Sequence, residues 1–143
     1  MAQGPEARFW SSVRASKPTK VFATRIENRA GGGIPDVHCV WDGLPFWIEL
    51  KASAFDRVKL SPHQIAWHTS YHSRGGLSFF LVSTPVRGSS ALISGSLVTQ
   101  LAEMSLSEVP GPRFLDLRSM WEGVGVAVRT HYSGLLSPAA EST

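Results

Sequence analysis

The stretch GGGIPDVHCVWDGLPFWIELKAS, residues 31–53, decides the fold of this chain of 143 residues. Two of its segments, residues 34–41 and 44–52, are rich in the apolar and aromatic residues that favour β-strands. Asp42-Gly43 lies between them, and this dipeptide is typical of the two-residue turn of a β-hairpin. The sequence therefore predicts two adjacent antiparallel strands.

The second strand carries two charged residues among its apolar ones. Side chains alternate between the faces of a strand, so Glu49 and Lys51 lie on one face while Ile48 and Leu50 point to the other. The hairpin brings Asp36, near the start of the first strand, within reach of Glu49. An unpaired carboxylate is costly to bury, and two carboxylates held together repel unless a divalent cation binds between them. This pattern indicates a Mg²⁺ site suited to phosphate chemistry.

The flanking segments predict a small α/β domain with a mixed sheet. Pro5 opens an expected helix of about three turns, and residues 21–27 form an expected strand. Ser61-Pro62-His63-Gln64 has the N-cap, the proline and the N3 glutamine of a helix start, and this helix is expected to end near Arg74. Further elements are expected along the rest of the chain: strands at 77–84, 91–94 and 114–117, and helices at 96–104 and near 118–124. We expect a single domain over residues 1–135 and a frayed tail at 136–143.

Composition and charge favour an intracellular protein with an anionic partner. The hydrophobic content of 43% is that of a globular chain, and no apolar run approaches the ~20 residues that span a bilayer. We expect a cytoplasmic protein, because the N-terminus lacks a secretory signal and the single Cys39, a predicted core residue, cannot form an internal disulfide. The net charge is +5 over residues 1–90 and −2 over residues 91–143. Nucleic acid suits this positive field, although a solvated basic surface without a partner explains the charge equally well.

The central motif resembles that of a known nuclease superfamily. Pro35-Asp36, followed after twelve residues by Glu49-Leu50-Lys51, resembles the Pro-Asp…(Asp/Glu)-x-Lys motif of the PD-(D/E)XK nucleases. Together, GGGIPD, ELK and SPHQ resemble the virus-type replication-repair nuclease (VRR-NUC) family, and their layout is similar to that of Holliday-junction resolvases. The resemblance spans roughly residues 4–85. It implies a restriction-endonuclease-like, three-layer α/β/α domain with a central mixed sheet.

The resemblance also implies a role for each site residue. Lys51 would position the attacking water, and Gln64 would be the polar catalytic residue that opens the following helix. Glu6, on the first helix, would complete the metal site, with Glu27 as the alternative acid. The implied cofactor is Mg²⁺, for which Mn²⁺ would substitute, and its implied ligands are Asp36, Glu49, Glu6 and the main-chain carbonyl of Leu50.

The implied reaction is hydrolysis of a DNA phosphodiester that leaves a 5′-phosphate and a 3′-hydroxyl. We expect a structure-specific endonuclease for branched DNA, a Holliday-junction resolvase, because the sequence contains no module that reads bases. Two symmetric nicks favour a C2 homodimer, and a phage enzyme would suit the compact domain. Two alternatives stay open: a less selective nickase, flap nuclease or restriction-like enzyme, and a non-catalytic DNA-binding subunit. Phosphate contacts are expected from four flanking cations: Arg25, Arg29, Arg57 and Lys59.

Other residues have plainer interpretations. The charged cluster could be a structural ion-pair set on a sheet face, although this would not explain the glycine loop. His68 and His72 are predicted to lie on a polar helix face rather than to bind a metal. The glycines at 31–33 are predicted to form a mobile loop at the mouth of the site. Three tryptophans are predicted to be core residues rather than base-stacking platforms: Trp10, Trp47 and Trp67.

Overall fold

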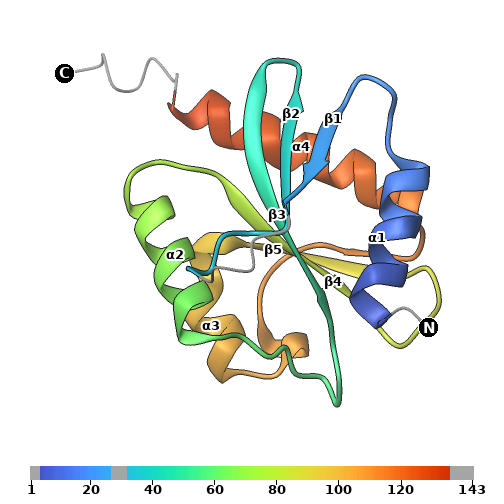
Figure 1. Cartoon of the computed structure of the whole chain (residues 1–143), viewed down its shortest axis with the longest axis vertical. Coiled ribbons are helices and arrows are strands. Elements are labelled where there is room, and N and C mark those ends of the chain that lie inside the picture. Colours follow the sequence, from blue (N-terminus) through green and yellow to red (C-terminus); the bar gives the residue numbers. More distant parts are fainter. Residues whose placement is uncertain (1–3, 27–31, 136–143) are drawn as a thin grey trace.

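A six-stranded sheet lies between two helical layers in the computed structural model, which describes residues 4–26 and 32–135 (Figure 1). The strands are β1 Phe22–Arg25, β2 Val37–Trp41, β3 Leu44–Ala52, β4 Ser78–Ser83, β5 Ser90–Ser94 and β6 Arg113–Phe114. The helices are α1 Pro5–Ser16, α2 Pro62–Ser73, α3 Val98–Glu103 and α4 Leu117–Leu135, with short 3-10 turns η1 Gly95–Leu97 and η2 Leu106–Glu108.

The strands lie in sequence order across the sheet, and this order confirms the predicted mixed sheet. All neighbours are antiparallel except β3 and β4, which are parallel and joined by the crossover helix α2. The predicted hairpin joins β2 to β3, and Asp42 and Gly43 have the left-handed φ values of 52° and 77° that a type I′ turn requires. Val37 pairs with Ile48, so the next residues outward, Asp36 and Glu49, lie opposite each other.

Two hydrophobic cores, one on each face of the sheet, confirm the α/β/α arrangement. The larger core joins the sheet to α1 and α4, and it contains Trp10 and the fully buried Cys39, as predicted. The smaller core joins Phe80 and its neighbours to α3 and the inner side of α2. Trp47 and Trp67 belong to neither core, so the prediction for these two is wrong. They are partly exposed and meet edge to face, with ring centroids 5.9 Å apart.

The C-terminal third differs most from its prediction. The expected strand at 114–117 is reduced to Arg113–Phe114, and the last helix begins at Leu117 and continues for 19 residues. Gly123 and Gly125 do not interrupt this helix, because they are sites of close packing. A Cβ at Gly123 would lie 2.2 Å from the ring of Phe114, and one at Gly125 would lie 2.9 Å from Trp41.

The histidines of α2 do not lie on a polar face, so that prediction is also wrong. His68 is fully buried, and its Nδ1 lies 2.7 Å from the Ser78 hydroxyl oxygen. His72 Nε2 lies 2.8 Å from the same oxygen. Burial lowers the pKa of His68 to about 3 and also lowers that of His72. The pair therefore fastens α2 to β4 as neutral rings.

The predicted domain boundary and the predicted C-terminal tail are not tested by the structure. The single domain over residues 1–135 stays a prediction, and the expected frayed tail at 136–143 lies outside the described residues. None of the described helices is both long enough and apolar enough to cross a membrane.

Candidate active site

Asp36 and Glu49 meet on the face of the sheet where α2 begins. Asp36 lies just before β2, and its Oδ2 accepts a hydrogen bond of 2.8 Å from the Leu50 N–H of β3. This bond turns the Asp36 carboxylate toward β3 instead of into solvent. The two carboxylates predicted from strand alternation are therefore brought together.

Glu49 is the most buried charged side chain of the site, at 3% exposed. Its Oε2 accepts a hydrogen bond of 3.3 Å from Gln64 Nε2, while its Oε1 has no hydrogen-bond partner among the described residues. Burial, followed by repulsion from Asp36, raises the pKa of Glu49 to about 9. The nearby Lys51 opposes this shift but does not cancel it, so the carboxyl group favours either a proton or a bound cation.

Gln64 joins the start of α2 to both charged residues of β3. Its main-chain N–H donates to Ser61 Oγ at 3.1 Å, and the Ser61 N–H donates to its Oε1 at 2.9 Å, which together form a capping box. The same Oε1 accepts a hydrogen bond of 3.2 Å from Lys51 Nζ. The helix start therefore fixes the positions of Lys51 and Glu49 relative to each other.

Glu6 approaches this group from the first turn of α1. Burial raises its pKa, while the nearby Lys51 lowers it and Asp36 raises it again. Nevertheless, no group of three or more His, Cys, Asp or Glu side chains within residues 4–26 and 32–135 is placed to hold a metal ion. Glu6 thus lies at the edge of the Asp36–Glu49 pair, and Glu27, the alternative acid, lies outside the described residues.

Two cavities flank Gln64 and together form the cleft of the site. One, of about 540 Å³, is lined by residues that include Glu6, Lys51 and Lys59. The other, of about 260 Å³, is lined by residues that include Asp36 and Glu49. Ser61 and Gln64 line both cavities, so the cleft extends along the N-terminal end of α2.

Gly33 and His63 form a contact that the sequence did not reveal. Gly33 has a φ of 73°, and a Cβ at this position would lie 2.2 Å from the His63 carbonyl oxygen. The end of the glycine segment therefore packs directly on the first turn of α2, next to Gln64. His63 also lines the cavity that contains Asp36 and Glu49. Its position in the Ser-Pro-His-Gln helix start is the one signal that could have identified it.

Of the four residues predicted to bind phosphate, two lie at or near the cleft. Lys59 lines the cleft, and Arg25 of β1 is close enough to lower the pKa of Glu6. Arg57 is exposed in the loop between β3 and α2. Arg29 lies outside the described residues.

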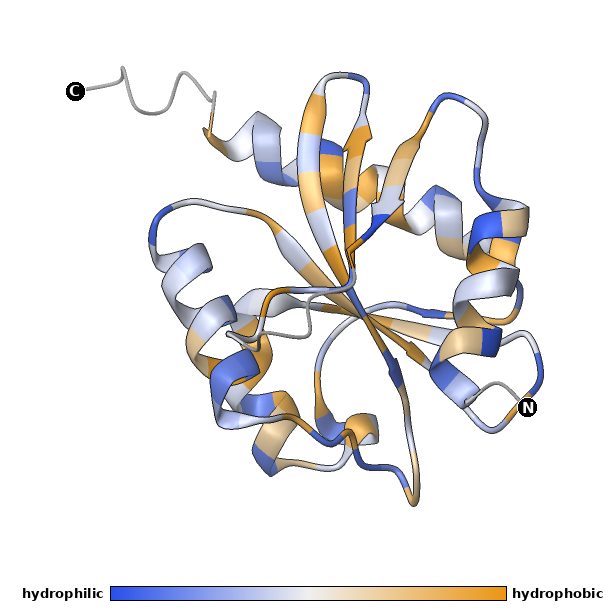
Figure 2. Cartoon of the chain, viewed as in Figure 1, coloured by the Kyte–Doolittle hydropathy of each residue, from blue (hydrophilic) through white to orange (hydrophobic). Residues whose placement is uncertain are grey.

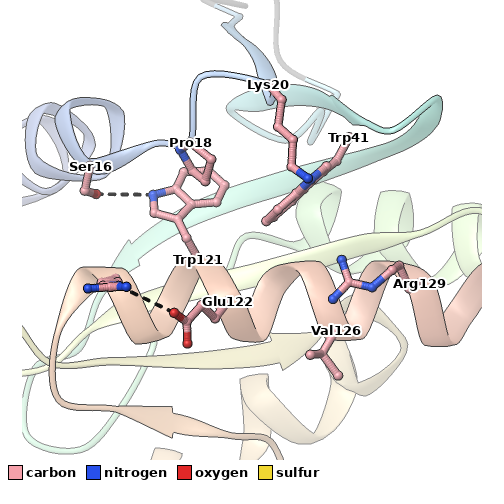
Figure 3. Close-up of a pocket in the computed structure, with 9 residues that line it drawn as sticks. Ser16, Pro18, Lys20, Trp41, Trp121, Glu122, Val126 and Arg129 are labelled. Atoms are coloured by element: carbon pink, nitrogen blue, oxygen red, sulfur yellow. Dashed lines mark hydrogen bonds and ion pairs between the residues drawn. The ribbon is translucent and has the colours of Figure 1, made fainter.

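A separate cavity of about 440 Å³ lies on the other side of the sheet, against α4 (Figure 3). Trp41 and Trp121 form its apolar wall, and the indole N–H of Trp121 donates to Ser16 Oγ at 3.2 Å. Its one acid, Glu122, forms an ion pair with Arg118 at 3.6 Å. This cavity lacks the paired carboxylates of the cleft, so the cleft is the candidate site for hydrolytic chemistry.

The cleft has the donor set of a hard divalent cation. Two carboxylates lie side by side, and Glu49 has one buried oxygen without a hydrogen bond. Oxygen ligands of this kind suit Mg²⁺, which is typically held by one or two carboxylates together with water and phosphate oxygens. Lys51, held beside them by Gln64, could offset negative charge on a phosphate.

Comparisons with known proteins identify similar folds. No family model and no curated protein matches the chain. A solved VRR_NUC domain is 21% identical, covers 55% of this chain and 84% of its own, and has a TM-score of 0.45. Hjc, a Holliday junction resolvase from the archaeal hyperthermophile Archaeoglobus fulgidus, is 13% identical, covers 81% of this chain and 96% of its own, and has a TM-score of 0.49. At these values the likeness concerns the fold alone.

Proposed function

We propose that this protein is a Mg²⁺-dependent endonuclease that hydrolyses phosphodiesters of branched DNA, with the four-way junction as its substrate. The observation that supports this proposal is the linked set of Asp36, Glu49, Lys51 and Gln64 in one cleft. One oxygen of Glu49 is buried without a hydrogen-bond partner in the described structure, and a bound cation would account for it better than an ion-pair cluster.

The carboxylates of Asp36 and Glu49 would hold the cation, together with the Leu50 carbonyl; Glu6, which lies at the edge of this pair, would become a ligand only after its side chain moves toward the cation. When bound, Mg²⁺ would polarise the scissile phosphate and lower the pKa of a coordinated water. The hydrogen bond from the Leu50 N–H holds Asp36 in place for this role, and the bond from Gln64 leaves one oxygen of Glu49 available.

Lys51 would position the attacking water and offset charge that develops on the phosphate. Its ammonium group donates to Gln64 Oε1, an oxygen that is already held by the Ser61 N–H. The capping box of α2 therefore fixes the orientation of Lys51. The products would be a 5′-phosphate and a 3′-hydroxyl.

Branched DNA is the proposed substrate because the described part of the chain, residues 4–26 and 32–135, offers cations for backbone contacts and contains no base-reading module. Lys59 in the cleft, Arg25 near Glu6 and Arg57 in the exposed loop between β3 and α2 would bind phosphates, which carry no direct sequence information. A C2 homodimer would supply the two sites that two symmetric nicks require. A less selective nuclease and a non-catalytic DNA-binding subunit are the alternatives that the experiment separates.

The test compares an end-labelled four-way junction with a linear duplex of the same arm sequences, in Mg²⁺ or EDTA, for wild type and Asp36→Asn. We expect paired nicks near the branch point that both EDTA and Asp36→Asn abolish. Equal cutting of both DNAs would overturn junction specificity and indicate the less selective nuclease. Binding without cutting in Mg²⁺ and Mn²⁺ would overturn catalysis and favour the DNA-binding subunit.

A further inference from the structure

Phe55, in the loop between β3 and α2, is completely exposed to solvent. The loop extends to the lower edge of the molecule in Figure 1, and Figure 2 shows hydrophobic colour at its tip. A single exposed apolar side chain is common on protein surfaces and by itself indicates nothing. The way this chain builds and supports the tip is what makes Phe55 unusual.

The tip is a tight hairpin turn, and Phe55 occupies a position in it whose backbone conformation disfavours phenylalanine. Ala54 and Arg57 exchange two main-chain hydrogen bonds, each 3.0 Å long. Phe55 and Asp56 between them have φ values of 52° and 58°, the left-handed pair that defines a type I′ turn. Glycine, asparagine and aspartate favour these positions, whereas a left-handed phenylalanine is sterically unfavourable. Neither burial nor local backbone preference explains why Phe55 occupies this position.

Contacts with η2 hold this turn in place. The two carboxylate oxygens of Asp56 accept hydrogen bonds from the Ser107 N–H at 3.1 Å and the Ser107 hydroxyl at 2.6 Å. The Asp56 carbonyl also accepts a bond of 2.7 Å from the Leu106 N–H. Val58, on the returning side of the loop, is buried in the smaller core. These contacts fix the turn, and the side chain of Phe55 points from it into solvent.

The tip lies within a short distance of the candidate active site. Phe55 follows Lys51 by four residues, so their Cα atoms are at most ~14 Å apart. On the returning side, Arg57 is exposed and Lys59 lines the cleft. A DNA strand with a phosphate at Lys51 would therefore meet these two cations on its way past the tip.

We infer that Phe55 is a wedge that stacks on an unpaired or unstacked base of the DNA held in the cleft. This inference rests on the proposed function, since it takes the occupant of the cleft to be DNA. Inserting an apolar side chain into a continuous duplex requires unstacking of a base step, whereas the stack is already interrupted at a branch point. Such a wedge would therefore favour branched DNA over linear duplex without reading sequence.

The test measures DNA affinity in EDTA with an Asp36→Asn background, using fluorescence anisotropy on a four-way junction and a matched linear duplex. Adding Phe55→Ala is expected to weaken junction binding on the order of 10-fold and to change duplex binding by less than about twofold. Phe55→Trp is expected to keep the junction affinity. Val86→Ala, which changes another exposed apolar residue in the β4–β5 loop, is expected to change neither. A 2-aminopurine at the branch point should report stacking with Phe55 and lose that signal in Phe55→Ala.

Two results would overturn the inference. One is unchanged junction affinity, or an equal loss for junction and duplex, in Phe55→Ala. The other is a change of oligomeric state in Phe55→Ala without DNA, measured by analytical ultracentrifugation, which would assign the tip to contact with another copy. Because binding is measured in EDTA with a variant that lacks Asp36, these outcomes are separate from failure of the nuclease proposal, which shows as absent cleavage by wild type.

Discussion

Glu49 has the least favourable environment of any carboxylate in the described chain, and this follows from where β3 places it. Alternation along the strand predicts that Glu49 and Lys51 share a face, and the hairpin turn predicts that Asp36 lies opposite. Those placements could be derived from the sequence. The hydrogen bonds that Gln64 makes to both β3 residues could not, because they depend on how α2 meets the sheet after the loop of residues 53–61.

Replacement of Glu49 by glutamine should stabilise the protein in EDTA at alkaline pH. The folded pKa of Glu49 is raised from 4.5 to about 9, so between these values the folded state keeps a proton that the unfolded state has lost. Wild-type stability should therefore fall as pH rises through this window, by about 1.4 kcal/mol per pH unit for one proton. Urea unfolding at pH 5, 7 and 9 checks this. Parallel pH dependences for wild type and Glu49→Gln would contradict it.

At the scale of elements, the glycine segment and α2 depend on each other. Gly33→Ala should reduce both stability and cleavage, because its Cβ would collide with the His63 carbonyl and the Gln64 nitrogen, at 2.2 and 2.7 Å. Gly32→Ala is the matched control, since it also has a positive φ but no atom within 4 Å of its Cβ. Both changes carry the backbone cost of about 1–2 kcal/mol. Urea unfolding and a nicking assay should show a larger loss for Gly33→Ala, and equal losses would argue against the contact.

The histidines of α2 should make the fold sensitive to acid. His68 keeps a folded pKa of about 3, whereas the unfolded residue gains a proton below about 6.5, so stability should fall as pH decreases from 6.5 toward 3. His68→Asn should be less stable at pH 7 but should show a shallower decline, by about 1.4 kcal/mol per pH unit. The exposed His63→Asn serves as control. An unchanged slope in His68→Asn, measured by urea unfolding, would contradict this account.

The wrong predictions concern helices whose structure depends on contacts with residues that are distant in the sequence. His68 and His72 of α2 point toward the sheet because both rings form hydrogen bonds with the hydroxyl group of Ser78 on β4. Gly123 and Gly125 suggest a broken helix from propensity alone, but packing against Phe114 and Trp41 overrides that preference. Helix starts and turns were easier to predict, because their signals are local.

At the scale of the whole molecule, Lys51 and Lys59 line the cleft and Arg25 lies near Glu6, so DNA affinity should depend on salt concentration. Each phosphate contact contributes about 0.9 to the slope of log affinity against log salt concentration. Lys59→Ala should reduce this slope by about 1, because Lys59 lines the cleft. Lys20→Ala should leave it unchanged, because Lys20 pairs with Asp42 at 3.9 Å at the hairpin turn. Affinities at several salt concentrations test this, and equal slopes for Lys59→Ala and wild type would place the DNA elsewhere.

The sequence predicted the sheet and its two covering layers because hydrophobic periodicity and turn residues specify them. It did not predict the extent of α4, which completes the larger core behind the strands that carry the site. The motif alone therefore identified the candidate chemistry, whereas the framework that holds it required the full packing of the chain.

The most direct test of the central claim is nicking of an end-labelled four-way junction in Mg²⁺ or EDTA by wild type, Lys51→Ala and Lys59→Ala, with analysis of the new ends. The account predicts nicks with 5′-phosphate and 3′-hydroxyl ends in Mg²⁺ and none in EDTA. It predicts a loss of at least about 100-fold in Lys51→Ala, and a smaller loss in Lys59→Ala that high enzyme concentration restores. Cleavage that survives EDTA, or that Lys51→Ala performs at the wild-type rate, would contradict the assignment of this cleft as a metal-dependent nuclease site.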